Sequence, residues 1–178
     1  MGFVENKYKK VHGIKQEQTN ACWAACLAWW MKATKHPVPL SQHALRQESD
    51  IKNMYKSDSV TGTVFTKNEK DYGILEKWEL LSVLRQPRFG MYVREEANIN
   101  PWHIAETLAD NGPIIIGFYD TYAQGNHVNV ICGYDVDTDM VEVMEPRNGH
   151  FIERGLTTYI GGPDPNVFAW KKMPVVNA

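Results

Sequence analysis

Cys22 and Gln16 are the residues of this sequence whose types and spacing best suit a chemical reaction. Cys22 opens a run of small and apolar residues that favours a helix, and Thr19 and Asn20 just before it can cap the N–H groups at a helix start. These N–H groups and the partial positive charge of a helix N-terminus favour a thiolate over a thiol. Gln16 lies six residues upstream, where its amide could donate to an oxyanion in front of the sulfur. The pattern predicts that Cys22 is a nucleophile.

His127 is the candidate base that would take the proton of the thiol and return it to the leaving group. It begins a run rich in β-branched residues shortly after Gln124 and Gly125, and we expect it at a sheet edge facing the cysteine helix. The remaining histidines lie in polar, turn or helical surroundings, where an ordinary surface role is expected. They are His12, His36, His43, His103 and His150.

The other two cysteines are predicted to be small buried hydrophobes. Cys26 lies inside the expected helix and Cys132 inside the His127 strand, which are usual settings for a structural cysteine. Cys22 and Cys26 share one helical face and could bind a metal together, but no Cys or His pair with zinc-site spacing accompanies them in the sequence. We therefore expect neither a metal nor another cofactor.

Three stretches of the chain resemble papain-like cysteine peptidases. Gln16, followed after five residues by Cys22-Trp-Ala, resembles the start of the C39-like peptidases and of the AvrRpt2-type effector proteases of family C70. In these families the glutamine stabilises the oxyanion, and Gln18, only four residues before the cysteine, matches less well. Farther along, Pro113–Gly117 and His127–Tyr134 resemble their Pro-(β-branched)-Gly strand and their Gly-His-(Val/Ala)-Val-x-x-Gly-Tyr strand.

The resemblance implies a third catalytic residue and a fold. In these families the residue that orients the histidine falls on the next strand, in an Asp-Pro or Asn context, and Glu145-Pro146 takes that place here. Glu145 is the better match although Glu replaces the more usual Asp, and Asn148 is the alternative. The implied fold is α+β, a papain-like domain in which the nucleophile helix packs on an antiparallel sheet.

The elements that must position these residues divide the chain into a helical half and a β half. Residues 1–15 form a polar lead-in with a strand near Tyr8–Ile14, residues 16–112 are mainly helical, and residues 113–178 form antiparallel strands, all within a single domain 1–178. Trp78 and Trp102 are expected on buried helix faces. Helices are expected from Cys22 to about Ala33, from Gln42 to about Ser49 after the cap Ser41, from Leu75 to Leu84, and from Pro101 after the cap Asn100 until Asn111. Strands are expected at Phe89–Val93, Pro113–Tyr119, Gly125–Tyr134, Met140–Met144, Phe151–Ile152 and Val167–Trp170.

Composition limits the partners that this chain can have. Its 178 residues are 43% hydrophobic, which suffices for one sizeable core. The formal net charge is −2 without a block of like charge, so nucleic acid is not expected as a partner. No apolar run is long enough to span a membrane, no secretory signal is present, and three cysteines are too few for a disulfide framework. We expect cytoplasmic synthesis, with export as a leaderless bacterial effector left open, and the sequence indicates no oligomeric state.

The predicted function is hydrolysis of peptide bonds by Cys22, with His127 as base and then acid and Glu145 orienting the imidazole. Gln16 and the backbone N–H of Cys22 would stabilise the oxyanion. A deamidase, a transglutaminase-like enzyme or an amidase acting on cell-wall peptides would use the same residues, because all of them form a thioester. A non-catalytic papain-like binding module is the alternative from another class, and an unreactive Cys22 would mark it.

The substrate is expected to be a peptide or protein held in a groove between the helical and the sheet half. The residues expected on its walls are Trp23, Gln124, Gly125 and Asn126. The stretch 35–100, which should shape the rest of the groove, carries no motif from which the specificity could be predicted.

Overall fold

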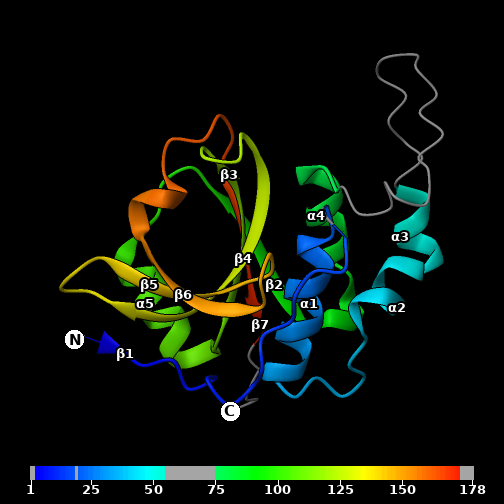
Figure 1. The fold of residues 1–178 in the computed structure, drawn as a ribbon, viewed down its shortest axis with the longest axis horizontal. Helices are drawn as coiled ribbons and strands as arrows, with labels where there is room; N and C mark the ends of the chain where they lie inside the picture. The colour runs from blue at the N-terminus through cyan, green and yellow to red at the C-terminus, as the bar shows by residue number, and fades with distance from the viewer. Residues whose placement is uncertain (1–2, 19, 55–74, 173–178) are drawn as a thin grey trace, which may run out of the picture.

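An antiparallel sheet runs through the middle of the structure, with helices on both of its faces (Figure 1). The computed structural model describes residues 3–18, 20–54 and 75–172. Within these residues the sheet has seven strands in the order β2-β7-β3-β4-β5-β6, and β1 pairs with the last residues of β4. All of these strand pairs are antiparallel.

Most strands and helices lie close to their predicted positions. The strands are β1 (Phe3–Val4), β2 (Met91–Glu96), β3 (Ile114–Asp120), β4 (Gly125–Asp135), β5 (Met140–Glu145), β6 (His150–Gly155) and β7 (Asn166–Lys171). The helices are α1 (Cys22–Ala33), α2 (Gln42–Gln47), α3 (Ser49–Met54), α4 (Lys77–Leu84) and α5 (Pro101–Asn111), with 3-10 helices at η2 (Pro87–Phe89) and η3 (Leu156–Tyr159). The α+β prediction, with the Cys22 helix packed on an antiparallel sheet, is confirmed.

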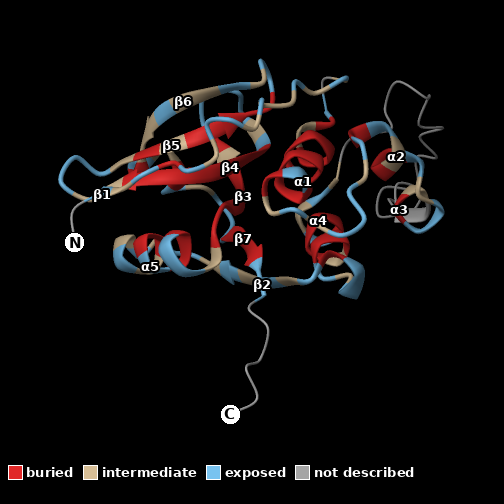
Figure 2. Ribbon diagram, turned by 90° about the horizontal axis from the view of Figure 1, so that it is seen from below, coloured by how far each residue is buried: buried red, intermediate tan, exposed pale blue. Residues whose placement is uncertain are grey.

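Helix α1 packs on one face of the sheet beside α4 and is buried on nearly all sides (Figure 2). Two of its tryptophans are buried with their ring N–H groups hydrogen-bonded: Trp30 Nε1 donates to Pro113 O at 2.9 Å and Trp29 Nε1 to Val11 O at 3.2 Å. Because any shift of this helix would expose apolar surface to water, α1 holds its first residue, Cys22, in a fixed place.

Helix α5 packs on the opposite face of the sheet together with η3 (Figure 2). Its buried residues Ile104, Ala105 and Leu108 belong to a second apolar cluster that includes alternate residues of the central strands. Asn100 caps the helix with its side-chain oxygen and Pro101 takes the first helical position, as predicted. Both faces of the central strands are therefore buried, which explains their nearly continuous apolar sequence.

The start of α1 differs from the prediction. Its N-cap is Ala21 and no side chain at that position makes a capping hydrogen bond. Thr19 lies outside the described residues, and Asn20 precedes the N-cap. The turn before the helix is closed by the backbone, because Ala21 N donates to Gln18 O at 3.1 Å. The N-cap therefore places no polar side chain over the first turn, which carries Cys22.

The helix predicted from Gln42 to about Ser49 ends at Gln47, and a second helix that was not predicted follows it. Ser41 caps α2 as predicted, accepting a hydrogen bond from Ala44 N at 3.1 Å. Glu48 then adopts an extended backbone, which ends α2 at Gln47, and α3 begins at the next residue.

The predicted strand at Tyr8–Ile14 is wrong. The chain turns there, with Val11 N donating to Tyr8 O at 2.8 Å, and the strand of the lead-in is β1. Tyr8, Val11 and Ile14 pack against the core around α1, so their apolar spacing reflects this packing rather than strand pairing. Gly13 crosses closely over the turn after β5, where an added Cβ would lie 2.1 Å from Gly149 O.

Two tryptophans that were predicted to be buried are exposed. Trp78 in α4 is 53% exposed and Trp102 in α5 is 60% exposed. Each is the second residue of its helix, and helical side chains tilt toward the helix N-terminus, so both point beyond the packed turns. The buried face of α4 is made by Leu80, Leu81 and its last residues instead.

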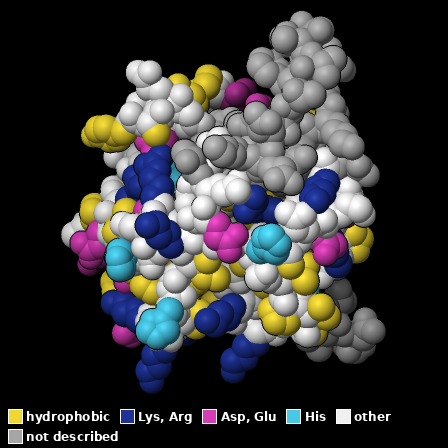
Figure 3. Space-filling model, turned by 45° about the vertical axis from the view of Figure 1, so that its right-hand side comes forward, with side chains coloured by type: hydrophobic (Ala, Val, Ile, Leu, Met, Phe, Trp, Pro, Cys, Tyr) yellow, Lys and Arg dark blue, Asp and Glu magenta, His cyan; other side chains and the backbone are white. Residues whose placement is uncertain are grey.

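The charged side chains are mixed on the face shown in Figure 3. Lys and Arg side chains there are interspersed with Asp and Glu side chains, and the described residues of this face form no single basic stripe. Among the helices of the described ranges, none is long and apolar enough to cross a membrane.

Candidate active site

Cys22 lies half-buried at the first position of α1, where it lines a cleft between the helices and the sheet. The cleft has a volume of about 570 Å³. Its opposite wall comes from the start of β4 and the end of β3, so the sulfur faces strand residues that are more than ninety positions away in the sequence. The two halves of the chain therefore meet at this thiol.

His127 is brought to Cys22 by β4. Its imidazole is almost fully buried, its Nε2 donates to Glu145 Oε1 at 2.8 Å, and it also forms a hydrogen bond with the Cys22 side chain. Since Nε2 faces the carboxylate, Nδ1 is the nitrogen available to the sulfur. Burial opposes the imidazolium, but the hydrogen bonds and charges of Cys22 and Glu145 outweigh it and raise the pKa of His127 from 6.5 to about 9.

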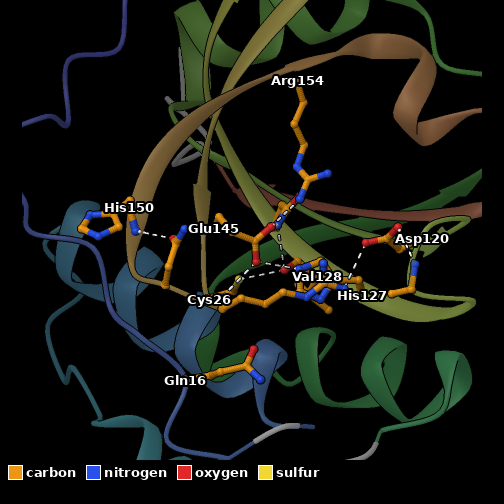
Figure 4. A network of polar contacts seen from close by, with 12 residues as sticks. Gln16, Cys26, Asp120, His127, Val128, Glu145, His150 and Arg154 are labelled. Carbon is orange, nitrogen blue, oxygen red and sulfur yellow. Dashed lines mark hydrogen bonds and ion pairs between the residues drawn. The ribbon is translucent and has the colours of Figure 1, made fainter.

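Glu145 ends β5 and accepts hydrogen bonds on both carboxylate oxygens. Besides His127, Oε1 accepts from the backbone N of Arg147 at 3.0 Å, while Oε2 accepts from Asn129 Nδ2 at 3.1 Å and Arg154 Nη2 at 2.6 Å. Burial disfavours the carboxylate, but these donors, His127 first among them, lower the pKa of Glu145 from 4.5 to about 2. Figure 4 shows Arg154 and His127 on different sides of this carboxylate.

The partner of the imidazole is Glu145 and not Asn148. Asn148 lies in the turn between β5 and β6, where its Oδ1 accepts from His150 N at 2.9 Å. Its side chain therefore stabilises the turn, whereas the Glu145 carboxylate is the group in contact with His127.

A further set of buried side chains supports the imidazole and the carboxylate. Asn129, which is fully buried, accepts a hydrogen bond from the Tyr159 hydroxyl at 3.2 Å while it donates to Glu145. The Phe118 ring packs edge-on against two other rings, with its centroid 5.7 Å from that of His127 and 4.6 Å from that of Tyr159. These contacts restrict the rotation of the ring, and sequence reasoning missed them. A polar Asn129 within an apolar strand was the one available signal.

Gln16 is positioned by a close crossing of two backbones. Gln16 N donates to Pro146 O at 2.7 Å, which ties the glutamine to the residue that follows Glu145. Glycines permit this approach: a Cβ on Gly149, whose φ is 74°, would lie 2.8 Å from Lys15 N. The side-chain Nε2 of Gln16 donates to Gln18 O at 2.9 Å. Figure 4 shows Gln16 beside α1, away from Arg154, and Gln16 is not among the residues that line the cleft.

Three of the four predicted groove residues line the cleft. Trp23, Gly125 and Asn126 do so, together with Cys22 and His127. Gln124 is not among the lining residues. It is exposed in the β3–β4 turn, where its φ of 50° is left-handed.

The sheet side of the cleft has an apolar wall. In the centre of β3, Gly117 lies opposite Val128 of β4 and Val167 of β7. Leu80 of α4 fills the space above the glycine, and a Cβ there would lie 2.8 Å from Leu80 Cδ2. All four residues line the cleft, so this wall is suited to an apolar side chain.

The two other cysteines are structural, as predicted. Cys26 is fully buried and its thiol donates to Val128 O at 3.3 Å, while Cys132 donates to Val130 O at 3.3 Å. Burial raises the pKa of both thiols well above the ordinary range. Neither thiol is therefore a nucleophile at neutral pH.

His103 does not line the cleft, and it is partly buried where an exposed position was predicted. It contacts the Arg94 guanidinium, hydrogen-bonds to Thr107 at 3.2 Å and packs edge-on against Trp170. Within the described residues, no three His, Cys, Asp or Glu side chains cluster as a metal site would require.

A thiol, a buried imidazole and an ionised carboxylate in hydrogen-bonded sequence are the components of a cysteine hydrolase. The fold is similar to that of solved proteases and peptidase domains. Xylellain, a cysteine protease from Xylella fastidiosa, has a similar structure with a TM-score of 0.60 over 98% of this chain and 87% of its own, at 11% identity. The peptidase domain of Streptococcus ComA, a bifunctional ABC transporter involved in quorum sensing, gives 0.53 over 90% and 98%, at 14% identity.

A double glycine motif protease from an AMS/PCAT transporter, solved in complex with the leader peptide, gives a TM-score of 0.50 over 96% of this chain and 99% of its own, at 16% identity. The family model of the papain-like cysteine protease AvrRpt2, Peptidase_C70, matches residues 6–162, which include Cys22, His127 and Glu145. The chain belongs to this family and is a papain-like cysteine peptidase. No curated protein sequence gives a match.

Proposed function

We propose that this peptidase hydrolyses peptide bonds through Cys22, His127 and Glu145, with Gln16 as an oxyanion donor. The observation that carries the proposal is the chain of contacts from the Cys22 side chain to the His127 ring and on to Glu145 Oε1, at the edge of a cleft. The pKa of about 9 at His127 supports it, because the imidazolium is then the form present at neutral pH.

In the first step the Cys22 thiolate attacks the carbonyl carbon of the scissile bond. The carbonyl oxygen becomes an oxyanion, to which the Cys22 backbone N–H and the Gln16 amide donate. His127 gives its proton to the departing amine, and a thioester with Cys22 remains. Water then attacks the thioester while His127 takes its proton, which releases the carboxylic acid and restores the thiolate–imidazolium pair.

Glu145 keeps the imidazole oriented during both steps. Because the donors around it hold its pKa at about 2, it stays ionised throughout the physiological range and favours the imidazolium. Its extra methylene compared with Asp is accommodated by contacts from β4 and β6.

The substrate in this proposal is an extended peptide lying along the cleft. The apolar wall around Gly117 would contact an apolar side chain, and Arg147, which also lines the cleft, presents a guanidinium that is anchored by Asp120 at 3.0 Å. The structurally similar double glycine motif protease was solved in complex with the leader peptide, which supports peptide binding by this fold. Export as a bacterial effector belongs to the same proposal and is supported by the family alone. Fractionation of a producing culture would test it.

The test is product identification with a mixture of defined peptides. Wild type should produce new peptide termini, detected by mass spectrometry, and Cys22→Ala should produce none, whereas Cys26→Ala should retain cleavage. In water enriched in oxygen-18, one heavy oxygen should enter the new carboxylate. Conversion of glutamine to glutamate, or coupling to an added amine, without new termini would contradict the proposal and favour a deamidase or a transferase.

A further inference from the structure

Arg154 lies on the edge strand β6 and reaches the carboxylate that supports His127. Its Nη2 donates to Glu145 Oε2 at 2.6 Å, while the other oxygen contacts His127 Nε2 at 2.8 Å. Two cationic groups thus hold one carboxylate from different sides (Figure 4). The Arg154 side chain is 17% exposed and that of Glu145 is 4% exposed. A charge-assisted bond this short and this well shielded is much stronger than an ion pair on the surface.

The register of the strands shows how far the two side chains must reach. Glu145 lies opposite His150 in the β5–β6 pairing, whereas Arg154 lies opposite Val141, four residues farther along. Their charged ends meet because both side chains are long and run toward each other along the sheet. An Asp at position 145 would end about 1.5 Å short. The contact therefore gives a reason for Glu where a shorter acid is more usual.

Arg154 differs from the other donors to this carboxylate in its charge and its place. Asn129 and the backbone N–H of Arg147 donate as neutral groups, so Arg154 supplies the one permanent positive charge in contact with Glu145 among the described residues. It is not among the residues that line the cleft. Its influence on the reaction must therefore pass through Glu145.

We propose that Arg154 is a positioning residue of the catalytic centre, whose guanidinium fixes the Glu145 carboxylate in place and keeps it ionised for His127. The proposal rests on the roles assigned above to Cys22, His127 and Glu145. Its physical basis is that a buried carboxylate takes up a proton unless cations and donors compensate for the lost water. Once protonated or displaced, Glu145 could no longer hold the imidazolium at the sulfur.

The test compares Arg154→Gln, Arg154→Lys and wild type over pH 2 to 8, by peptide turnover and by the rate of Cys22 alkylation with iodoacetamide. Arg154→Gln should lower kcat by roughly 10- to 100-fold at unchanged KM. It should also move the acid side of both pH profiles upward by at least one pH unit, because Glu145 then takes up a proton more readily. Arg154→Lys should restore the acid side but not the full rate, since an ammonium cannot reproduce the guanidinium geometry.

Arg94→Gln is the matched control. Arg94 also lies on an edge strand and also pairs with a glutamate, Glu96, but it belongs to β2 at the opposite edge of the sheet. Its removal should leave both pH profiles and kcat at wild-type values. A general effect of losing an edge-strand ion pair would appear in both variants.

Each outcome bears on the inference. A wild-type pH profile in Arg154→Gln, or an equal loss of rate at every pH in the Gln and Lys variants, would overturn it. If Arg154→Gln does not fold, Arg154→Lys decides, and a wild-type kcat there would overturn the inference. Failure of the roles proposed for Cys22 and His127 is distinguishable, because Cys22 alkylation would then be insensitive to His127→Ala, whatever Arg154 does.

Discussion

Replacing Glu145 by Gln should lower the pKa of His127 while preserving the shape of the site. Burial disfavours the imidazolium, and Cys22 and Glu145 together overcome it and raise the pKa of His127 from 6.5 to about 9. That difference corresponds to about 3 kcal/mol in favour of the cation. If Glu145 supplies about half of it, the variant should titrate about one pH unit lower, which is roughly a tenfold change in the ratio of imidazolium to imidazole.

The assay is an NMR titration of the His127 ring protons from pH 5 to 10. The chain has six histidines, so the signal is identified by its loss in His127→Ala. Asn148→Ala is the control, because Asn148 bonds to His150 N and not to the imidazole. The same pKa in Glu145→Gln and wild type would refute the reasoning, as would a fall in Asn148→Ala equal to that in Glu145→Gln.

Three further predictions concern the glutamine, the backbone crossing and the acid side of stability. Gln16→Ala should lower kcat by roughly 10²- to 10³-fold with KM unchanged in steady-state hydrolysis, and a change in KM alone would assign Gln16 to substrate binding instead. Gly149→Ala should cost about 1–3 kcal/mol in urea unfolding, because its φ is 74° and a Cβ would meet Lys15 N. Gly161→Ala, at a φ of 87° with open space around it, should cost less, and equal costs would contradict the role of the crossing. The lowered pKa of Glu145 contributes stability that is complete above pH 4.5 and is lost as the pH falls through about 2. Wild type should thus lose about 3 kcal/mol more than Glu145→Gln over that range, and parallel unfolding profiles would contradict this.

The sequence was sufficient to predict the elements whose signals are local. The run of small and apolar residues after Cys22 predicted α1, and Asn100-Pro101 predicted the start of α5. These succeed because capping, propensity and the absence of helix breakers act over a few neighbouring residues. The lead-in failed for the opposite reason. The path of Tyr8–Ile14 depends on a crossing over the distant Gly149, which no local pattern reports.

The same distinction holds within the site. The resemblance pointed to Cys22, His127 and Glu145, and the structure brings the three together. Asn129 and Arg154 could not be assigned because their contact with the carboxylate depends on the register of β4 and β6 against β5. Register follows from the complete set of strand pairings and from the turns between them.

The pairing of the Cys22 thiol with the His127 imidazole is tested by the pH dependence of Cys22 alkylation by iodoacetamide. Rates are measured in wild type, His127→Ala and Cys26→Ala, with the modified residue identified by mass spectrometry. Modification of Cys22 should be rapid at pH 6 in wild type and Cys26→Ala, and this reactivity should be lost in His127→Ala. If the alkylation rate rises only near the ordinary cysteine pKa of ~8.5, and equally with and without His127, the pairing of Cys22 with His127 is contradicted.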